Sequence, residues 1–156
     1  MITYAQERLA SAMDDMREMV PAQYKHTGDP TLPLDPNWQV YSALETRDAA
    51  ALFIARNADR AVGYSTALLH PHMNSKQVLV GTISTYYVEE CQIRGLIMRQ
   101  LLRTACDWLT TRGAQRVYVE TEYRHSAGTL LERMGFTPVK IGYMMPTDGD
   151  RAGSLQ

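Results

Sequence analysis

Apolar residues recur at intervals of three and four positions near the start of the chain, which is the spacing of one helix face. This stretch covers residues 4–20, and Pro21 predicts its end. A loop with three prolines, residues 27–36, separates it from a second predicted helix at residues 37–47. Asp35 is the candidate cap of that second helix. The apolar face of the first helix consists of Leu9, Met13, Met16, Met19 and Val20.

Helical spacing returns twice in the second half of the chain. Residues 95–112 predict a long helix, and Gly113 follows it at the place where glycine commonly ends helices. A shorter helix is predicted at residues 126–134, before Gly135. The apolar face of the long helix consists of Leu96, Ile97, Leu101, Leu102, Ala105, Trp108 and Leu109.

Several segments rich in β-branched and aromatic residues predict strands. They are residues 51–56, 61–69, 77–88, 116–122 and 137–145. The first two are joined by a short polar turn, so they predict a hairpin. Residues 70–75, which include His70 and His72, are predicted to form a loop.

The predicted order of elements is helix, helix, three strands, helix, strand, helix, strand. Hairpin strands followed by strand–helix–strand units predict a mixed α/β fold, in which a mostly antiparallel central sheet is flanked by helices on both faces. A chain of 156 residues, 45% of them hydrophobic, is long enough for one core. We therefore expect a single domain over residues 1–156, in which residues 146–156 form a flexible tail.

Charge and cysteine content narrow the classes of partner. The formal net charge is −1, so the chain lacks the overall positive field with which nucleic-acid-binding proteins neutralise phosphates. No segment approaches the ~20 apolar residues that a membrane span requires. The two cysteines, Cys91 and Cys106, do not form a disulfide framework or a metal-ligand cluster. We expect a cytoplasmic protein without a metal site.

One segment carries a chemical signal: a strand end at Tyr87 and Val88, a short loop, and a helix start near Gly95. Such a loop presents unpaired backbone N–H groups, and the helix dipole adds partial positive charge, so the place favours an anion such as pyrophosphate. Gly95 lacks the Cβ that would hold a phosphate away from the backbone, and Arg94 and Arg99 add positive charge. The alternative is an ordinary strand–loop–helix connection.

Residues 87–97 (YVEECQIRGLI) resemble the signature of the GCN5-related N-acetyltransferases: a hydrophobic strand end, Gln or Arg, two residues, Gly, one residue, and Gly or Ala. Residues 127–136 (AGTLLERMGF) resemble a later segment of that family, and residues 60–64 (RAVGY) resemble the entry into its third strand. The resemblance covers residues 51–145, and the layout is similar to that of small phage members. It implies acetyl-CoA as co-substrate. The implied coenzyme-binding residues are Tyr87, Val88, Gln92, Ile93, Arg94, Gly95, Leu96, Ile97, Met98 and Arg99.

The sequence departs from the family pattern at four positions. Ile97 replaces the last small residue of the signature, so we expect it to narrow the approach to the phosphates. Glu89 replaces a frequent proline, and Arg124 a frequent asparagine. Leu131 stands where the family often has a tyrosine that protonates the departing thiolate. Because leucine cannot transfer a proton, either another group does so, or the thiolate leaves unaided, or the protein has lost catalysis.

An amine that attacks a thioester must lose a proton, so the reaction needs a base near the strand end or a water chain to one. The carboxylates available as a base are Glu89 and Glu90 near the strand end, and Glu120 and Glu122 on one face of the adjacent predicted strand. We assign the role to Glu89 or Glu120, and burial of Glu120 would strengthen its case because a buried carboxylate rarely stands unpaired. Tyr143 is the candidate general acid, with Tyr86 and Tyr87 as the other phenols near the expected thiol. The alternative is that the carboxylates are solvated and the phenols belong to the core or its rim.

These observations predict an N-acyltransferase that moves an acetyl or other short acyl group from acyl-CoA to a primary amine. The amine would attack directly in a ternary complex, without a covalent enzyme intermediate. The alternative is a catalytically inactive coenzyme-binding or protein-interaction module. The expected partners are an amine-bearing acceptor and, in a homodimer, a second copy of the chain; a membrane partner is not expected, and the charge does not favour nucleic acid.

Overall fold

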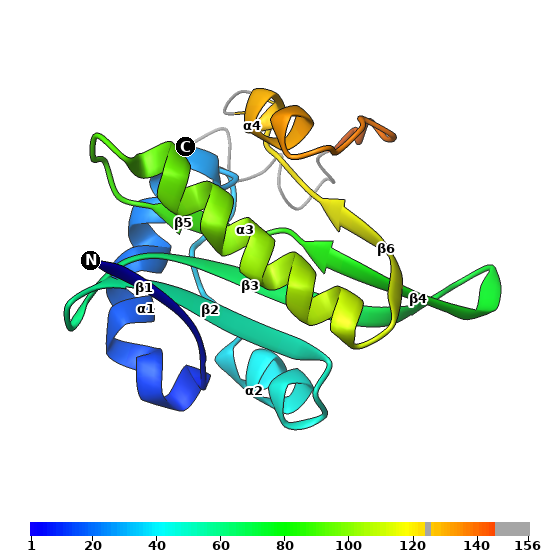
Figure 1. The fold of residues 1–156 in the computed structure, drawn as a ribbon, viewed down its shortest axis with the longest axis horizontal. Coiled ribbons are helices and arrows are strands. Elements are labelled where there is room, and N and C mark those ends of the chain that lie inside the picture. Colours follow the sequence, from blue (N-terminus) through cyan, green and yellow to red (C-terminus); the bar gives the residue numbers. More distant parts are fainter. Residues whose placement is uncertain (124–125, 146–156) are drawn as a thin grey trace.

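The computed structural model describes residues 1–123 and 126–145 (Figure 1). Its strands form one sheet in the order β1-β2-β3-β4-β6, and β5 pairs with β3 beyond the end of β4. The pairings are antiparallel except for that of β4 with β6. The predicted mixed α/β class with a mostly antiparallel sheet is thus confirmed. The elements are β1 (Ile2–Glu7), α1 (Leu9–Thr27), α2 (Trp38–Thr46), β2 (Ala50–Asn57), β3 (Arg60–His72), β4 (Ser75–Ile83), β5 (Tyr86–Val88), α3 (Arg94–Thr111), β6 (Ala114–Val119) and α4 (Gly128–Arg133).

Helices cover both faces of the sheet (Figure 1). On one face, α3 contributes Leu101 to a core that includes Phe53 of β2. On the other face, α1 contributes Met16 to a second core with Leu52, and α2 packs its Trp38 against the same cluster. Leu52 and Phe53 are neighbours in β2, so the alternation of strand side chains supplies both cores from one strand.

The first predicted helix is wrong at both ends. Residues 2–7 form β1, which pairs with β2 from Ile2↔Asn57 to Glu7↔Leu52. The helix α1 begins only at Leu9 and continues past Pro21, which lies inside it. A local pattern cannot reveal β1, because this edge strand is stabilised by a partner fifty residues away. Asn37, not Asp35, caps α2: the N–H of Val40 donates to Asn37 Oδ1 over 3.2 Å.

The predicted loop at residues 70–75 is also wrong, because β3 continues through it to His72 and β4 begins at Ser75. His70 pairs with Val80 in the ladder between these strands. The long strand predicted at residues 77–88 is present, but it is interrupted between Ile83 and Tyr86. That interruption is the structural basis of the candidate site.

The end of the described chain departs from the prediction. Residues 137–145 contain no strand, whereas the strand predicted at 116–122 is β6. Gly113 and Gly135 have φ of +91° and +94°, conformations that favour glycine, which confirms them as the stops of α3 and α4. The expected tail at residues 146–156 lies outside the described residues. In the part of the chain that the structure describes, no helix is long and apolar enough to cross a bilayer.

Candidate active site

A β-bulge at Ser84 and Thr85 separates β4 from β5. Leu68 pairs with Thr82 and Ser65 pairs with Tyr86, so three steps along β3 match four steps along the partner strand. One extra residue is therefore inserted at the interruption, and such bulges redirect the strand that carries them. The bulge turns β5 toward the first part of β3.

Because of this turn, β5 and the end of β6 diverge. β6 follows β4 in parallel as far as Ile83↔Val119, and the N–H of Glu120 still donates to the Ile83 carbonyl over 2.9 Å. Beyond this point the strand keeps its pairing with β3, now as β5, and no longer pairs with β6 (Figure 1). Tyr86 spans the resulting opening, because its hydroxyl donates to the carbonyl oxygen of Glu120 over 2.9 Å.

The edge of β5 that faces this opening carries backbone groups without a strand partner. The N–H of Glu89 donates to the Val62 carbonyl, and the N–H of Thr66 donates to the Thr85 carbonyl. In an antiparallel ladder these groups alternate between the two edges of a strand. The N–H and C=O of Tyr86 and Val88 therefore point into the opening, whereas those of Tyr87 point toward β3. Of the two residues predicted to offer free backbone groups, Val88 therefore does so and Tyr87 does not, while the coenzyme contact itself stays a prediction.

The N-terminus of α3 fits an anion. Its cap, Ile93, makes no side-chain capping bond, and the first turn holds no acidic residue. Within the described residues, the N–H of Gly95 has no hydrogen-bond partner. A Cβ built on Gly95 meets nothing within 4 Å, so the backbone here is open to a ligand. Free donors at the positive end of a long helix suit the pyrophosphate of a coenzyme.

The side chains of the predicted coenzyme loop divide between solvent and core. Gln92, Ile93, Leu96 and Arg99 are exposed, and Arg94 forms an ion pair with Glu90. Met98 is half-buried. Ile97 is only 2% exposed and packs in the core beneath α3. The expectation that Ile97 narrows the approach to the phosphates is therefore wrong, because its side chain points into the protein.

The predicted catalytic residues occupy three different settings. Glu89 forms an ion pair with Arg60. Glu120 is exposed, so the burial that would have strengthened its case is not observed. Tyr143 is 94% exposed and belongs to no strand. The structure does not bring these three together, and their catalytic roles stay predictions.

The alternation of side chains along β6 shows on which face of the sheet Glu120 lies. Val117 and Val119 pack in the core under α3, so Glu120 lies on the opposite face. The parallel register pairs Ile83 with Val119, which sets Glu120 beside Ser84 of the bulge. Its carboxylate is thus on the face of the sheet that α1 and α2 cover.

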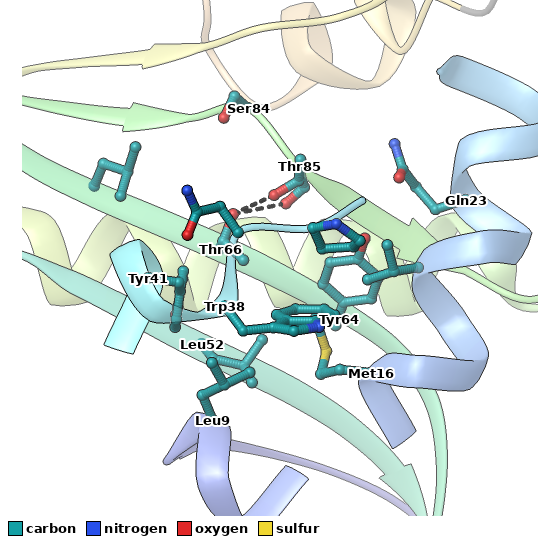
Figure 2. A pocket seen from close by; sticks show the side chains of 14 residues that line it. Leu9, Met16, Gln23, Trp38, Tyr41, Leu52, Tyr64, Thr66, Ser84 and Thr85 are labelled. Atoms are coloured by element: carbon teal, nitrogen blue, oxygen red, sulfur yellow. Dashed lines mark hydrogen bonds between the residues drawn. The ribbon is translucent and has the colours of Figure 1, made fainter. Parts of the chain in front are cut away.

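On that face, a pocket of about 260 Å³ lies between α1, α2 and the bulge (Figure 2). Thr66, Ser84 and Thr85 line it at the bulge, and Trp38 and Tyr41 line it from α2. This pocket is not among the sites predicted from the sequence. The available signal was the pair Ser84-Thr85, two small polar residues that interrupt an otherwise apolar strand.

The structure describes some, but not all, of the positions where the sequence departs from the family pattern. Leu131 is 7% exposed and packs in the same core as Ile97. Arg124, and His125 beside it, lie outside the described residues. His70 belongs to β3, and its Nε2 lies 3.1 Å from Thr82 Oγ1. Tyr86 is a phenol that lies at the opening, where its hydroxyl donates to the Glu120 carbonyl.

Comparisons with known proteins agree with this geometry. The sequence profile described as "Acetyltransferase (GNAT) family" matches residues 12–136. Among curated proteins, no sequence matches this chain with significant similarity.

Solved structures with the same fold differ in what their names say they acetylate. Glucosamine-6-phosphate N-acetyltransferase from Arabidopsis thaliana superposes with a TM-score of 0.72 at 9% identity, covering 95% of this chain and 99% of that one. Ribosomal-protein-alanine N-acetyltransferase from Brucella melitensis biovar Abortus 2308 gives 0.70 at 18%, covering 94% and 100%. The aminoglycoside acetyltransferase meta-AAC0020 from an uncultured soil metagenomic sample, solved with sisomicin, gives 0.68 at 14%, covering 93% and 97%. Since the profile spans most of the sequence, this chain belongs to the GNAT family of acetyltransferases.

Proposed function

We propose that the protein transfers an acetyl group from acetyl-CoA to a primary amine. The observation that carries this proposal is the opening between β5 and β6, where the free edge of Val88 lies on the same connection as the uncapped start of α3. The start of α3 suits a pyrophosphate, and the free edge at Val88 suits the amide-rich arm and the acyl carbonyl of a coenzyme thioester. Acetyl-CoA would supply the activated acyl group.

In this proposal the coenzyme would be bound along one connection of the chain. The N–H of Gly95, which has no partner among the described residues, would donate to a phosphate. Arg99, and Arg94 despite its ion pair with Glu90, would add positive charge. The N–H of Val88 would be available to polarise an acyl carbonyl, the type of donor that stabilises developing negative charge on oxygen. Binding both ends along one connection fixes the position of the reacting carbon, and positioning can supply much of the rate.

For proton transfer we propose Glu120 as base and Tyr86 as acid. Glu120 lies beside Ser84 on the pocket face, so it can accept the proton of an amine held there, directly or through water. Tyr86 lies at the opening on the other face, where a thiolate would leave. Burial raises the pKa of Tyr86, which keeps the phenol protonated and able to donate at neutral pH. Tyr143, at 94% exposure, has no comparable support.

The test is the release of free thiol from acetyl-CoA in the presence of primary amines, followed with a thiol reagent. We expect release that depends on the amine and saturates with both substrates. Glu120→Gln should lower kcat about 100-fold, with little change in KM for acetyl-CoA. Glu122→Gln is the matched control and should keep the parent values of kcat and KM. An unchanged kcat in Glu120→Gln would remove Glu120 from the mechanism.

A second candidate function is a coenzyme-binding module without turnover. It is favoured by Leu131, a buried aliphatic residue at the position of the family's acid. Calorimetry separates the two proposals: acetyl-CoA binding without amine-dependent thiol release would support the module, and release would exclude it.

A further inference from the structure

We infer that the acceptor is a small primary amine attached to an uncharged aromatic or branched apolar group; this rests on the proposed acetyl transfer. The site is the pocket on the α1 and α2 face of the sheet (Figure 2). It meets the coenzyme side of the sheet at the bulge, since Ser84 and Thr85 line it and the opening begins directly after them. An amine seated in it would have its nitrogen at the bulge.

The lining of the pocket is uncharged. Of its 14 lining residues, nine are apolar or aromatic and five are neutral polar residues, and none of these described residues carries a formal charge. A second ammonium, a phosphate or a carboxylate on the acceptor would lose hydrating water in this pocket without gaining a charged partner from its lining, which is unfavourable. The pocket therefore selects against polycations and anionic sugars.

The polar and apolar linings lie at different ends. Figure 2 shows Thr66, Ser84 and Thr85 on the side of the bulge, with Thr66 and Thr85 bonded to each other. Leu9, Met16 and Leu52 lie at the opposite end. An acceptor with a single amine at one end and an apolar body at the other matches this arrangement, because hydroxyl groups can receive N–H bonds while the apolar body leaves water.

Size and shape restrict the apolar body further. The pocket volume of about 260 Å³ corresponds to roughly nine water molecules at about 30 Å³ each, which suits one or two rings and a short chain. Trp38 and Tyr64 present aromatic rings to it. Aromatic rings in offset or edge contact gain stabilisation beyond that of the area that they bury. A flat ring on a short alkylamine chain satisfies all of these features.

The reaction balances without another reactant. The neutral amine nitrogen forms the new N–C bond with the acetyl carbon, and the thioester C–S bond breaks. One proton leaves nitrogen and one is delivered to sulfur, so the products are an N-acetylated amine and free coenzyme A thiol. No oxidant or reductant is consumed.

The test compares kcat/KM for four probe amines at saturating acetyl-CoA: 2-phenylethylamine, tryptamine, spermidine and glucosamine 6-phosphate. We expect the two aryl-alkylamines to exceed the other two by at least tenfold. A preference for spermidine or glucosamine 6-phosphate would overturn the inference and leave acetyl transfer intact. Absence of thiol release with every probe, despite acetyl-CoA binding, would instead contradict the proposed enzyme.

Two variants test whether the pocket is responsible. Gln23 lines it from α1, and Gln23→Glu adds one carboxylate with almost no change in volume. This should raise kcat/KM for spermidine relative to 2-phenylethylamine roughly fivefold. Trp38→Ala should raise KM for 2-phenylethylamine at least tenfold and leave KM for acetyl-CoA unchanged. Val40→Ala, in the same helix at 53% exposure and outside the lining, is the control. Equal KM values in the Trp38 and Val40 variants would overturn the inference.

Discussion

The hydroxyl of Tyr86 donates to the carbonyl oxygen of Glu120 over 2.9 Å, and this bond spans the opening between two strands that no longer pair. Both residues follow directly from the bulge: Tyr86 is the first residue of β5, and Glu120 is the first after β6. The phenol belongs to the face that α3 covers, whereas the Glu120 side chain belongs to the face of the pocket. One contact therefore joins the two sides on which acetyl donor and amine acceptor would lie.

Tyr86→Phe removes that hydroxyl and keeps the ring. We expect kcat to fall at least tenfold with KM for acetyl-CoA changed less than twofold, because a donor to the leaving sulfur acts in the transition state. The free energy of unfolding should fall by about 1 kcal/mol, the usual net contribution of one hydrogen bond. Steady-state kinetics and urea unfolding measure the two effects.

The control for this change is Tyr87→Phe. Tyr87 lies on the other face of β5, packs beside Tyr64, and makes no side-chain hydrogen bond to the described residues. The Tyr87→Phe variant should therefore keep the kcat of the parent protein. Because the pKa of Tyr86 is raised by burial, its neutral form is present below the ordinary value of 10 and is lost only as pH rises through the higher folded-state value. A kcat that falls already at pH 8 to 9 would contradict an acid role for this phenol.

Gly95→Leu should abolish acetyl-CoA binding without weakening the fold. The Cβ position is open, with nothing within 4 Å, and the backbone is not in a conformation reserved for glycine. A side chain there would occupy the space that we propose for the phosphates and leave the core untouched. We expect no saturable binding by calorimetry and a free energy of unfolding equal to or above the parent value, since replacing a helical glycine commonly adds about 0.5–1 kcal/mol.

Gly135→Ala is the opposite case and serves as its control. Gly135 has φ of +94°, which an L-residue with a side chain adopts only with strain. This variant should unfold about 1 kcal/mol more easily while acetyl-CoA affinity changes less than twofold. If Gly95→Leu binds acetyl-CoA as the parent does, the coenzyme site is not at the start of α3.

Much of this arrangement could be predicted from sequence because it is encoded locally. The helix face that carries Leu101 and Leu109 can be predicted from the spacing of apolar residues alone. The end of α3 can be predicted from Gly113, because its positive φ favours glycine. The anion site that we propose near Gly95 also rests on a local feature, a strand end beside a helix start, and it stays a prediction. The same spacing predicts the burial of Ile97, because Ile97 belongs to the predicted apolar face of α3 and a residue on that face points to the core. The family signature suggested otherwise.

The parts that were missed depend on partners distant in sequence. β1 reads as helix because six residues of edge strand carry no signal except their pairing with β2. The strand predicted at residues 137–145 has strand-like composition but no partner in the described sheet. The bulge at Ser84 and Thr85 appears only when two registers along β3 are compared. These are tertiary effects, and they override local propensity.

Cys91 and Cys106 should differ in reactivity, which matters for any thiol-release assay. Cys91 is exposed, whereas burial raises the pKa of the Cys106 thiol to about 11, with a smaller contribution from the charge of Asp107. At pH 8 only about one Cys106 in a thousand would be a thiolate, the reactive form. We expect one fast equivalent per native chain with a disulfide reagent, absent in Cys91→Ser, and two in urea.

The same shift sets a pH dependence for stability. Because the folded-state pKa of Cys106 lies above its ordinary value of 9, the stabilisation from keeping this thiol neutral is complete below pH 9 and is lost as pH rises through about 11. Cys106→Ala should therefore show a shallower loss of stability between pH 9 and 11 than Cys91→Ala. Equal slopes in the two variants, or two fast equivalents in the native protein, would contradict burial of Cys106.

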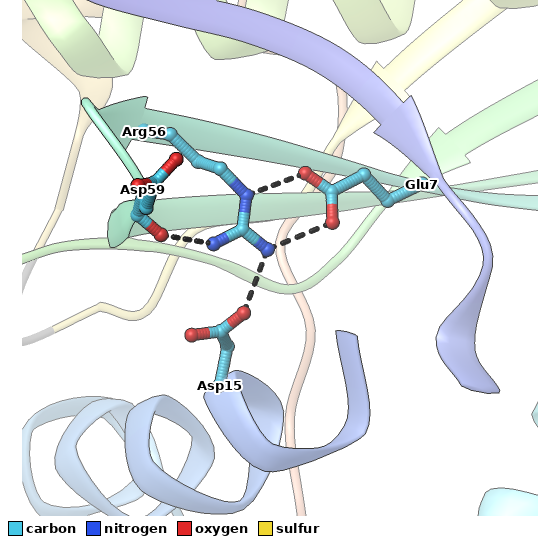
Figure 3. A network of polar contacts seen from close by, with 4 residues as sticks. All are labelled: Glu7, Asp15, Arg56 and Asp59. Atoms are coloured by element: carbon cyan, nitrogen blue, oxygen red, sulfur yellow. Dashed lines mark hydrogen bonds and ion pairs between the residues drawn. The ribbon is translucent and has the colours of Figure 1, made fainter. Parts of the chain in front are cut away.

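Arg56 should be the charged residue on which the N-terminal strand most depends (Figure 3). It donates to both carboxylate oxygens of Glu7 over 2.7 and 2.8 Å, to Asp15 over 2.7 Å, and to the Asp59 carbonyl over 2.8 Å. The guanidinium thus ties β1, α1 and the β2–β3 turn together. These hydrogen bonds, led by that of Glu7, raise the pKa of Arg56 above its already high value.

Arg56→Met leaves the carboxylates of Glu7 and Asp15 close together without their cation. The Arg56 side chain is only 21% exposed. We expect a loss of about 2 kcal/mol in the free energy of unfolding, less than for a fully buried pair because water reaches the site. Arg56→Lys should recover only part of it, since an ammonium cannot reproduce the planar two-bond contact with Glu7. Arg17→Met is the control: its pair with Asp14 spans 3.7 Å at 67% exposure of the arginine, so the change should stay within about 0.5 kcal/mol. Urea denaturation of the three variants decides the point, and equal losses at Arg56 and Arg17 would show that the network does not hold β1 in place.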